Sequence, residues 1–315
     1  MITIGLLLLT YVSHEVTSKE IGSQQSERDA LLKLRERVRD CLTEDYQDSE
    51  YLLRWLRDNK FDVDKAEQML RKSIEWRREW KVDKLKNLEL PELFKRYFTH
   101  GLSGFDKEGA PVVIVPFSDL DAPGILNLVG SDEFITGTLK VFEYYQILAR
   151  QRFSEFGPNA GKILLIIDMT GFHFKLTTKL SEAKILGRRL TQMYQDNYPD
   201  SMKHCFLLNV TSTFKLAFSM MSSYLGNLKP HIKLYKASEF AKAKQDLLER
   251  VEADQLPAHY GGTMTDADGN PKCVTKINYG GRVPENYPVE NRLIDLLGKY
   301  DDSEDSSSEC YEGII

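Results

Sequence analysis

The sequence lacks the excess of positive charge that nucleic-acid binders carry. Its formal net charge is −5. Between Lys299 and Ile315, six acidic residues face one lysine, so this short stretch accounts for the whole imbalance. Residues 1–298 carry no net charge. This argues against nucleic acid as a partner, because proteins that bind nucleic acid show a strongly basic domain.

Cysteine and histidine occur without the spacings that build metal sites or disulfide frameworks. No cysteine pairs with another at C-x-x-C spacing, and a 315-residue chain needs no disulfide to hold a core. The four cysteines are Cys41, Cys205, Cys273 and Cys310. We interpret them as reduced thiols, and the six scattered histidines predict no metal site.

Three motifs of nucleotide-binding and hydrolytic enzymes are also missing. The sequence has no G-x-G-x-x-G after a strand, no G-x-x-x-x-G-K-[ST] and no G-x-S-x-G. One pair of residues could act together as an acid and a base: Asp168 ends an apolar run, and His173 follows five residues later. We favour a structural role for Asp168, as a hydrogen-bond acceptor in the D-M-T-G turn. The sequence therefore predicts a protein without catalytic activity.

No segment is long and apolar enough to span a bilayer, but the N-terminus carries a short apolar stretch. Residues 2–12 read I-T-I-G-L-L-L-L-T-Y-V, and Val16-Thr17-Ser18 offers a possible cleavage site. A secretory signal normally has a basic residue before such a stretch, and none is present. Two interpretations stay open: a flexible leader on a cytoplasmic protein, which we expect, or a secreted protein.

What the sequence does contain is an alternation of apolar runs and helical patterns. Helical periodicity starts at Ser26, covers 48–59 and resumes after Asp62, a good N-cap residue. Beyond His100, short apolar runs predict strands at 112–115, 162–169, 205–210 and 231–235, separated by helices at 131–156, 178–196, 212–225 and 238–251. This order predicts a mostly parallel sheet, an α/β fold.

One helical segment is apolar on several faces. Thr213 to Leu225 reads T-F-K-L-A-F-S-M-M-S-S-Y-L, whereas a surface helix has a single apolar stripe. Either the helix is deeply buried, or it covers a lipid cavity and sometimes meets a membrane. Two adjacent methionines favour the second interpretation, because methionine repacks against varied partners.

Five motifs together give the chain a family resemblance. They are L-L-R-W-L-R-D-N-K-F-D-V-D-K-A, G-F-D-K-E-G-A-P-V, I-I-D-M-T-G, D-N-Y-P-D-S-M-K, and L-P-A-H-Y-G-G-T-M-T-D-A-D-G-N-P-K-C with K-I-N-Y-G-G. Across residues 28–290 the chain resembles the CRAL-TRIO lipid-transfer family, and within it the animal supernatant protein factor and tocopherol-associated branch.

The resemblance implies an α/β lipid-binding domain preceded by a small all-helical domain, with a hydrophobic pocket under a mobile gate helix at Thr213–Leu225. The implied division is a leader (1–25), a helical domain (26–97), the lipid-binding domain (98–262), an extension (263–298) and a disordered acidic tail (299–315). Pocket residues carried over by position are Val113, Val115, Tyr144, Leu148, Leu164, Ile166, Met193, Phe206, Leu208, Phe214, Phe218 and Met221.

The expected activity is to bind one hydrophobic lipid and move it between membranes, as a monomer that contacts membrane surfaces transiently and needs no cofactor. In relatives that transfer phosphatidylinositol, an acidic residue occupies the position of Arg188 or Arg189. A lysine on their gate helix occupies the position of Ser222. We therefore expect a weakly polar ligand, such as a tocopherol-like lipid, a sterol precursor, a retinoid or an acyl chain, ahead of phosphatidylinositol; the ligand class also includes other phospholipids. Members of that branch continue into a β-sandwich (GOLD) domain. We expect this domain to be missing here, because the residues from Arg282 to Ile315 are too few to form one. The alternative function is a lipid-regulated adaptor that recruits a small GTPase or a lipid enzyme.

Overall fold

The computed structural model describes residues 24–43, 46–171 and 179–299 of the chain. They divide into two compact units after Glu75. Side chains at 118, 179–184, 217, 220–224 and 299 are not described. Cys41, Cys205 and Cys273 form no disulfide, and Cys310 lies outside the described residues.

The first unit is helical, as the sequence predicts. Residues 24–37 are helical, α2 runs Ser49–Asp58, and α3 runs Val63–Glu79 and crosses into the second unit. The side chain of Asp48 caps α2 by accepting a hydrogen bond from Tyr51 N, which satisfies a donor that the first helical turn leaves free. The core of the unit consists of Leu34, Val38, Leu52, Trp55, Leu56, Ala66 and Leu70.

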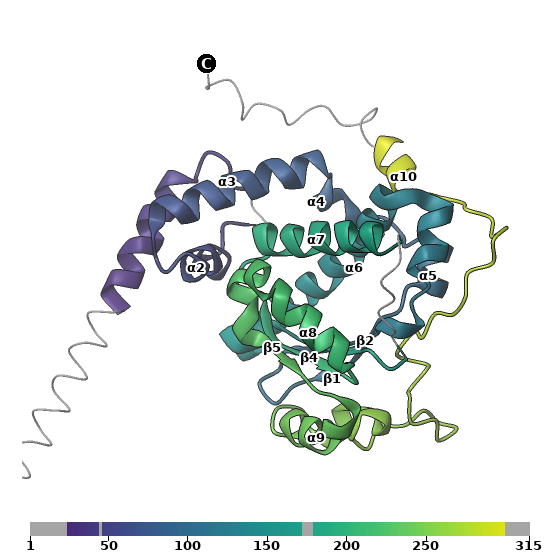
Figure 1. The fold of residues 1–315 in the computed structure, drawn as a ribbon. Coiled ribbons are helices and arrows are strands. Elements are labelled where there is room, and N and C mark those ends of the chain that lie inside the picture. The colour runs from purple at the N-terminus through teal and green to yellow at the C-terminus, as the bar shows by residue number, and fades with distance from the viewer. Residues whose placement is uncertain (1–23, 44–45, 172–178, 300–315) are drawn as a thin grey trace, which may run out of the picture. The chain divides into compact units, whose positions relative to one another are not determined.

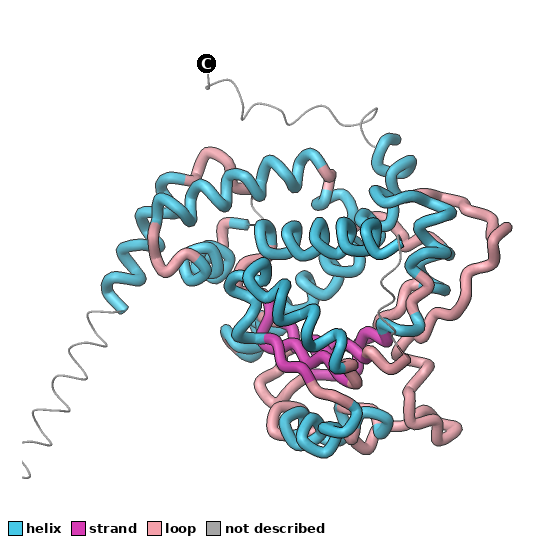
Figure 2. Tube along the Cα trace, in the orientation of Figure 1, coloured by secondary structure: helices cyan, strands magenta, loops and turns pink. Residues whose placement is uncertain are grey.

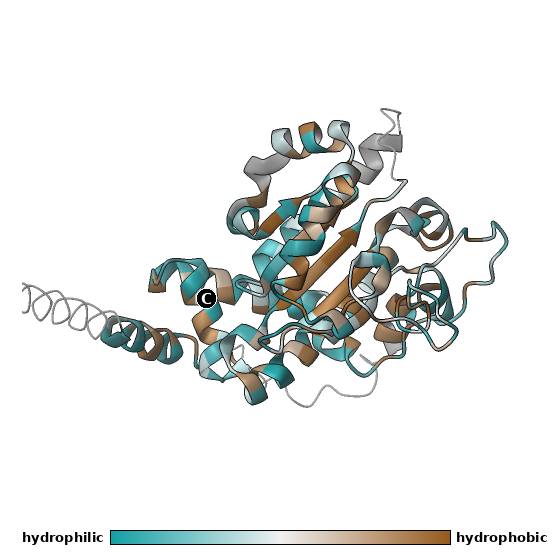
Figure 3. Ribbon diagram, turned by 90° about the horizontal axis from the view of Figure 1, so that it is seen from below, coloured by the Kyte–Doolittle hydropathy of each residue, from teal (hydrophilic) through white to brown (hydrophobic). Residues whose placement is uncertain are grey.

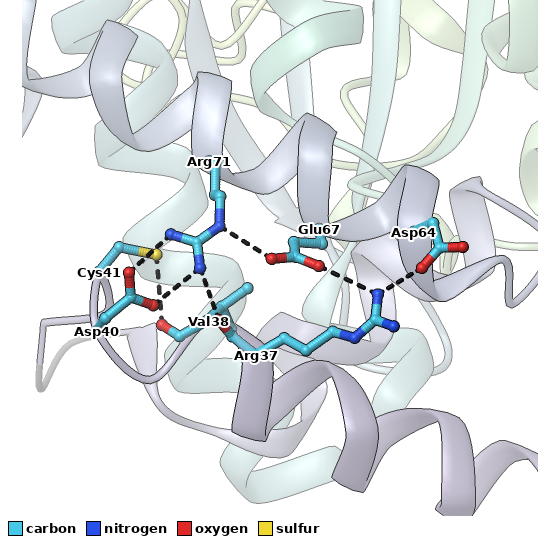
Figure 4. Close-up of polar contacts among 7 residues, drawn as sticks. All are labelled: Arg37, Val38, Asp40, Cys41, Asp64, Glu67 and Arg71. Atoms are coloured by element: carbon cyan, nitrogen blue, oxygen red, sulfur yellow. Dashed lines mark hydrogen bonds and ion pairs between the residues drawn. The ribbon is translucent and has the colours of Figure 1, made fainter. Parts of the chain in front are cut away.

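Charged side chains join two helices of the first unit on their solvent side (Figure 4). The Arg71 guanidinium binds both carboxylate oxygens of Asp40, at 2.8 and 2.9 Å, and reaches Glu67 at 3.1 Å. Arg37 binds Glu67 at 3.2 Å and also pairs with Asp64. Asp64, Glu67 and Arg71 of α3 are therefore paired with charged groups of the same unit.

The second unit is built on a five-stranded sheet in the order β1-β2-β3-β4-β5 (Figure 2). Its strands are β1 Gly101–Phe105, β2 Pro111–Pro116, β3 Ile163–Asp168, β4 Met202–Leu208 and β5 Ile232–Leu234. β1 pairs antiparallel with β2, and every later pair is parallel. The predicted α/β fold with a mostly parallel sheet is confirmed.

Strand order determines which side of the sheet the helices cover. Helix α6 (Ala122–Phe156) joins β2 to β3, α7 (Lys179–Asn197) joins β3 to β4, and α8 (Ser212–Met221) with η4 (Ser222–His231) joins β4 to β5. Each parallel strand is added on the same side of its predecessor, so right-handed crossovers place all three helices on one face. Helix α9 (Phe240–Leu248) follows β5 and lies on the opposite face (Figure 1).

The longest helix, α6, contains a break that the sequence analysis did not place. Gly130 has φ 79° inside it, a left-handed conformation that glycine adopts without strain. The predicted helix 131–156 is thus the second half of α6, and Asp121 caps the first half through Gly124 N. The remaining elements are α4 Val82–Leu85, α5 Glu92–Tyr97, α10 Leu293–Lys299, η2 Phe117–Asp119, η3 Pro158–Gly161, η5 Ala237–Glu239, η6 Ala253–Gln255 and η7 Ala258–Tyr260.

Residues 76–97, assigned above to the helical domain, pack within the second unit. Helices α4 and α5 both contact α6. A buried ion pair fixes this arrangement: the Arg77 guanidinium binds the two Glu143 carboxylate oxygens at 3.0 and 3.1 Å. Tyr198, just after α7, donates to the same carboxylate at 2.7 Å. One buried charge pair therefore links the end of α3, α6 and the end of α7.

Two segments noted in the sequence, the apolar stretch 2–12 and the acidic residues 300–315, lie outside the described residues. Among the helices that are described, none combines the length and the apolar character needed to cross a membrane.

Removal of Glu143 takes the buried, bidentate partner from the Arg77 guanidinium, which keeps the more exposed Asp83, and it also removes the acceptor of the Tyr198 hydroxyl. We expect Glu143→Ala to lower the free energy of unfolding of the second unit by about 3–5 kcal/mol, measured by urea denaturation. The matched control is Asp132→Ala on the same helix, which breaks an exposed pair with Arg189 and should cost less than about 1 kcal/mol. Equal losses in the two variants would contradict the structural role of the buried pair.

Candidate lipid-binding face

The two faces of the sheet differ in how completely they are covered. Strand residues alternate between them, so neighbours in sequence face opposite sides. On the side of α9, the strand residues are sealed: Val112, Ile114, Leu164, Ile166, Phe206 and Leu208 are each 0 or 1% exposed. They pack against Leu247 of α9, against Leu256 and Tyr260 in the turns that follow α9, and against Ile277 of the extension. This face, the sealed face, is an ordinary closed core.

The other face lies under α6, α7 and α8, and its strand residues are unevenly buried: Val113, Cys205 and Leu207 are buried, but others are only half-buried. Val115, Leu165, Ile167, Ile232 and Leu234 all keep part of their surface accessible. Apolar side chains at the centre of a sheet normally lose nearly all accessible surface when helices cover them. The covering helices therefore leave part of the central strands on this side accessible, and we call this side the lipid face. Strands β2 and β3 are strongly apolar, and the strands seen in Figure 3 are largely hydrophobic.

Helix α6 lines one side of this region with aromatic and aliphatic groups. Val141, Tyr145 and Ala149 are buried against Val113, and Leu148 packs on the same cluster. Tyr144, in contrast, is 55% exposed. The Tyr145 hydroxyl lies 2.8 Å from His100 Nδ1, and burial lowers the pKa of His100 to about 4. His100 is therefore neutral at pH 7 and places no charge next to this cluster.

Helix α8 presents apolar groups both inward and outward. Thr211 caps the helix by accepting from Phe214 N at 3.1 Å. Phe214 packs on Cys205, Leu207 and Met169 of the sheet, and its ring stacks with that of Phe218. On the other side, Leu216 is 65% exposed. The helix ends at Met221, and the predicted remainder to Leu225 continues as a 3-10 turn.

A polar cluster holds the chain where it leaves the sheet for α8. Asp168, 3% exposed, accepts from Thr170 N, Thr170 Oγ1 and Asn209 Nδ2 at 2.6–2.9 Å. Asn209 adopts φ 58°, a left-handed conformation that these bonds stabilise. Tyr260 donates to the second carboxylate oxygen at 3.3 Å. The cluster therefore joins the ends of β3 and β4 to η7.

The charge on Asp168 is stabilised by its donors. His259 Nε2 lies 3.7 Å from the carboxylate, beyond hydrogen-bond distance. We attribute the lowered pKa of Asp168 to the closer donors Thr170 and Asn209, which outweigh the opposing effect of burial. Asp168 is thus a structural acceptor in the D-M-T-G turn, the role that we favoured from the sequence. His173, its proposed acid–base partner, lies outside the described residues.

The structure distributes the twelve predicted pocket residues over three places. Val113, Val115, Leu148 and Phe214 contact the clusters of the lipid face. Phe218 is half-buried on α8, and Tyr144 is exposed on α6. Leu164, Ile166, Phe206 and Leu208 belong to the sealed face, and Met193 packs between α6 and α7 with Leu139 and Tyr198. The side chain of Met221 is not described. These residues do not all surround one space.

Sequence analysis missed three half-buried residues of the lipid face: Leu165, Ile167 and Leu234. K-I-L-L-I-I-D-M is apolar at consecutive positions, so it contains no alternation that distinguishes one face from the other. The lipid-face residues could have been found only from the strand order together with the handedness of the crossovers, which predict the face that the helices cover. The strand register then assigns each strand residue to one face.

Adjacent leucines on β3 allow a direct test of the difference between the faces. Leu165→Trp adds volume on the lipid face, and we expect it to change the free energy of unfolding by less than about 1 kcal/mol, because space exists there. Leu164→Trp adds the same volume to the sealed face and should cost about 3 kcal/mol. Urea denaturation measures both. A loss at Leu165 as large as that at Leu164 would show that the lipid face is already filled.

Comparison with known proteins agrees with this architecture. Protein ctg-1 of Caenorhabditis elegans is 28% identical over 244 residues, which cover 76% of this chain and 62% of the nematode protein. The phosphatidylinositol/phosphatidylcholine transfer protein SFH4 of Arabidopsis thaliana is 32% identical over 231 residues, covering 70% of this chain and 36% of the plant protein. The match to these relatives therefore spans less than two thirds of their length.

The fold is also found among solved structures. The crystal structure of Sfh5 aligns with a TM-score of 0.58 over 88% of this chain and 98% of that one, at 15% sequence identity. The sequence profile of the CRAL/TRIO domain matches residues 95–262, more than half of the chain and all five strands of the sheet. This chain belongs to the CRAL/TRIO domain family.

Proposed function

We propose that this protein binds one hydrophobic lipid on the lipid face of its sheet and transfers it between membranes. The observation that carries the proposal is the half-exposure of Val115, Leu165 and Ile167 beneath the covering helices. An apolar surface that the protein leaves unfilled is suited to an apolar ligand. The plant relative, named as a phospholipid transfer protein, supports the lipid class.

Energetics favour a carrier over free diffusion of the lipid. Each methylene that leaves water gains about 0.8 kcal/mol, so a lipid seldom crosses water by itself. A bilayer and a dry protein interior offer the lipid a similar environment, so its free energy changes little when it moves between them. The rate of transfer is then limited by how the lipid enters and leaves the protein. Helix α8 supplies that access: Phe214 faces the sheet while Leu216 is exposed and available to a membrane.

The proposed function includes no chemistry on the lipid. Asp168, the one carboxylate that the sequence suggested as an acid or base, points to the sealed face, where the Tyr260 hydroxyl donates a hydrogen bond to it. Its Oδ1 already accepts the hydrogen bonds of Thr170 and Asn209. A general base must lie within reach of its substrate, and Asp168 lies on the face of the sheet opposite to the lipid face.

For the ligand we propose a weakly polar lipid ahead of phosphatidylinositol. Arg188 or Arg189 stands where phosphatidylinositol-transferring relatives resemble one another in an acid; both are exposed, and Arg189 pairs with Asp132 at 3.2 Å. Ser222 occupies the place of their gate lysine. A buried phosphate without a charged partner costs several kcal/mol. The motif resemblance further supports the supernatant protein factor and tocopherol-associated branch, with a monomer acting in the cytoplasm at membrane surfaces.

Native mass spectrometry tests carrier function and ligand choice together. After incubation with vesicles containing equal amounts of phosphatidylinositol and tocopherol, we expect a one-to-one adduct whose mass matches tocopherol. An adduct with phosphatidylinositol would contradict the proposed ligand and leave the carrier function standing. Absence of any lipid adduct, from these vesicles or from the purified protein, would contradict the carrier and favour an adaptor whose apolar face is structural.

A charge on α8 should block transfer. In Phe218→Asp the new carboxylate replaces a half-buried ring, and burying it costs several kcal/mol, so the closed, loaded state is lost. We expect vesicle-to-vesicle transfer to fall at least about tenfold, the effect of 1.4 kcal/mol. Phe156→Asp is the matched control, because Phe156 is an exposed phenylalanine at the far end of α6. Equal transfer rates in the two variants would exclude α8 as the gate.

A further inference from the structure

His100 lies on the lipid face at the start of the sheet. It directly precedes β1, in which Leu102 lies opposite Val113 of β2. Extended residues two apart face the same side, so His100 and Leu102 both face α6. The 2.8 Å contact between His100 Nδ1 and the Tyr145 hydroxyl agrees with this, because Tyr145 belongs to α6 and packs on Val113. Half-buried Val115 packs on the same cluster, so the pair borders the accessible part of the lipid face.

The imidazole of His100 is hydrogen-bonded through one nitrogen only. Within the described residues Nε2 has no hydrogen-bond partner, and it does not belong to the fully sealed polar atoms that lack one. The ring is held in place: it lies against the rings of Phe98 and Tyr145, with centroids 6.0 and 5.7 Å away, and Asn278 N donates to the His100 carbonyl oxygen at 3.0 Å. A neutral imidazole has one N–H and one lone pair. Nε2 therefore presents a free donor or a free acceptor at a fixed place, according to the tautomer.

The surroundings of this nitrogen disfavour an ionised ligand group. Burial lowers the pKa of His100 to about 4 and is the sole cause of the shift, so no charged side chain of the described part acts on the ring. Burial also raises the pKa of Tyr145, and both partners are neutral at pH 7. A carboxylate or phosphate bound here would be a buried charge without a counter-charge. A hydroxyl group can accept from an N–H or donate to a lone pair, so it matches Nε2 in either tautomer.

We propose that His100 Nε2 binds the hydroxyl group of the lipid and that Tyr145 is a positioning residue, which holds the imidazole through Nδ1. This inference rests on the proposed carrier function and narrows its ligand class to lipids with an uncharged hydroxyl group. Long-chain alcohols, sterols and phenolic lipids meet this requirement, whereas hydrocarbons and fatty acids do not. A ligand without the hydroxyl leaves Nε2 unpaired, which is the basis of the discrimination.

Two probes with one chain and different ends test the assignment. The full chain is incubated with vesicles that contain equal amounts of octadecanol and octadecane, and the bound lipids are extracted and quantified by mass spectrometry. His100→Phe/Tyr145→Phe removes both polar partners and keeps both rings, so stability should change little. We expect its bound alcohol-to-alkane ratio to fall about tenfold relative to the unaltered protein, the effect of one hydrogen bond, with octadecane still bound.

The matched control is His204→Phe. Burial lowers the pKa of His204 to about 4 as well, but this residue lies opposite Leu164 of the sealed face, so the ratio should stay unchanged. An unchanged ratio in the double variant, or an equal fall in the control, would overturn the assignment of His100 and leave the carrier function standing. Uptake of neither probe by the unaltered protein would overturn the carrier function and this inference with it.

NMR of the histidine ring nitrogens tests direct contact in the full chain. Octadecanol should shift the Nε2 signal of His100 and octadecane should leave it in place, whereas the signals of His204 should respond to neither probe. Tyr145→Phe alone should shift the Nδ1 signal without ligand and lower the alcohol-to-alkane ratio less than the double variant does, because Nε2 remains. Identical His100 signals with the two probes would contradict the proposed hydrogen bond.

Discussion

The arrangement of this protein depends on the order of its parallel strands. From β2 to β5 each new strand adds to the same edge, and each connection is a right-handed crossover. Doubly wound sheets reverse direction and place helices on both faces, but here α6, α7 and α8 share one face. The opposite face is left to α9 and the extension, whose small, irregular elements pack closely on it. The difference between a sealed face and a lipid face follows from this topology.

Helices that cover a sheet without filling the space beneath need other supports. Polar contacts supply them here, at the ends and edges of the helices. Arg77 and Glu143 hold α6 to the end of α3, Tyr198 ties the end of α7 to the same carboxylate, and Glu133 binds the start of α10. These bonds fix the helices through buried polar groups. The lipid face can therefore remain partly uncovered while the helical layer stays in place.

The Asp168 cluster shows how a residue that resembles a catalytic acid can serve the fold. Its position at the carboxyl end of a central strand is where α/β enzymes place their reactive groups. Here the carboxylate organises the left-handed turn at Asn209, from which the chain enters α8. The same carboxylate accepts a hydrogen bond from Tyr260, so it also ties the ends of β3 and β4 to η7.

The sequence by itself determined the class of fold and the positions of its elements. Apolar runs gave β2 to β5, helical periodicity gave α3 and α7 to α9, and the G-F-D-K-E-G-A-P-V and L-P-A-H-Y-G-G segments gave the family, because these signals are local in the chain. Only the tertiary structure decided which residues lie on the lipid face. Leu164 and Leu165 are chemically identical neighbours, yet one is sealed and the other half-exposed. That distinction comes from strand register and from the side of the sheet on which the crossover helices lie, and no local pattern encodes either.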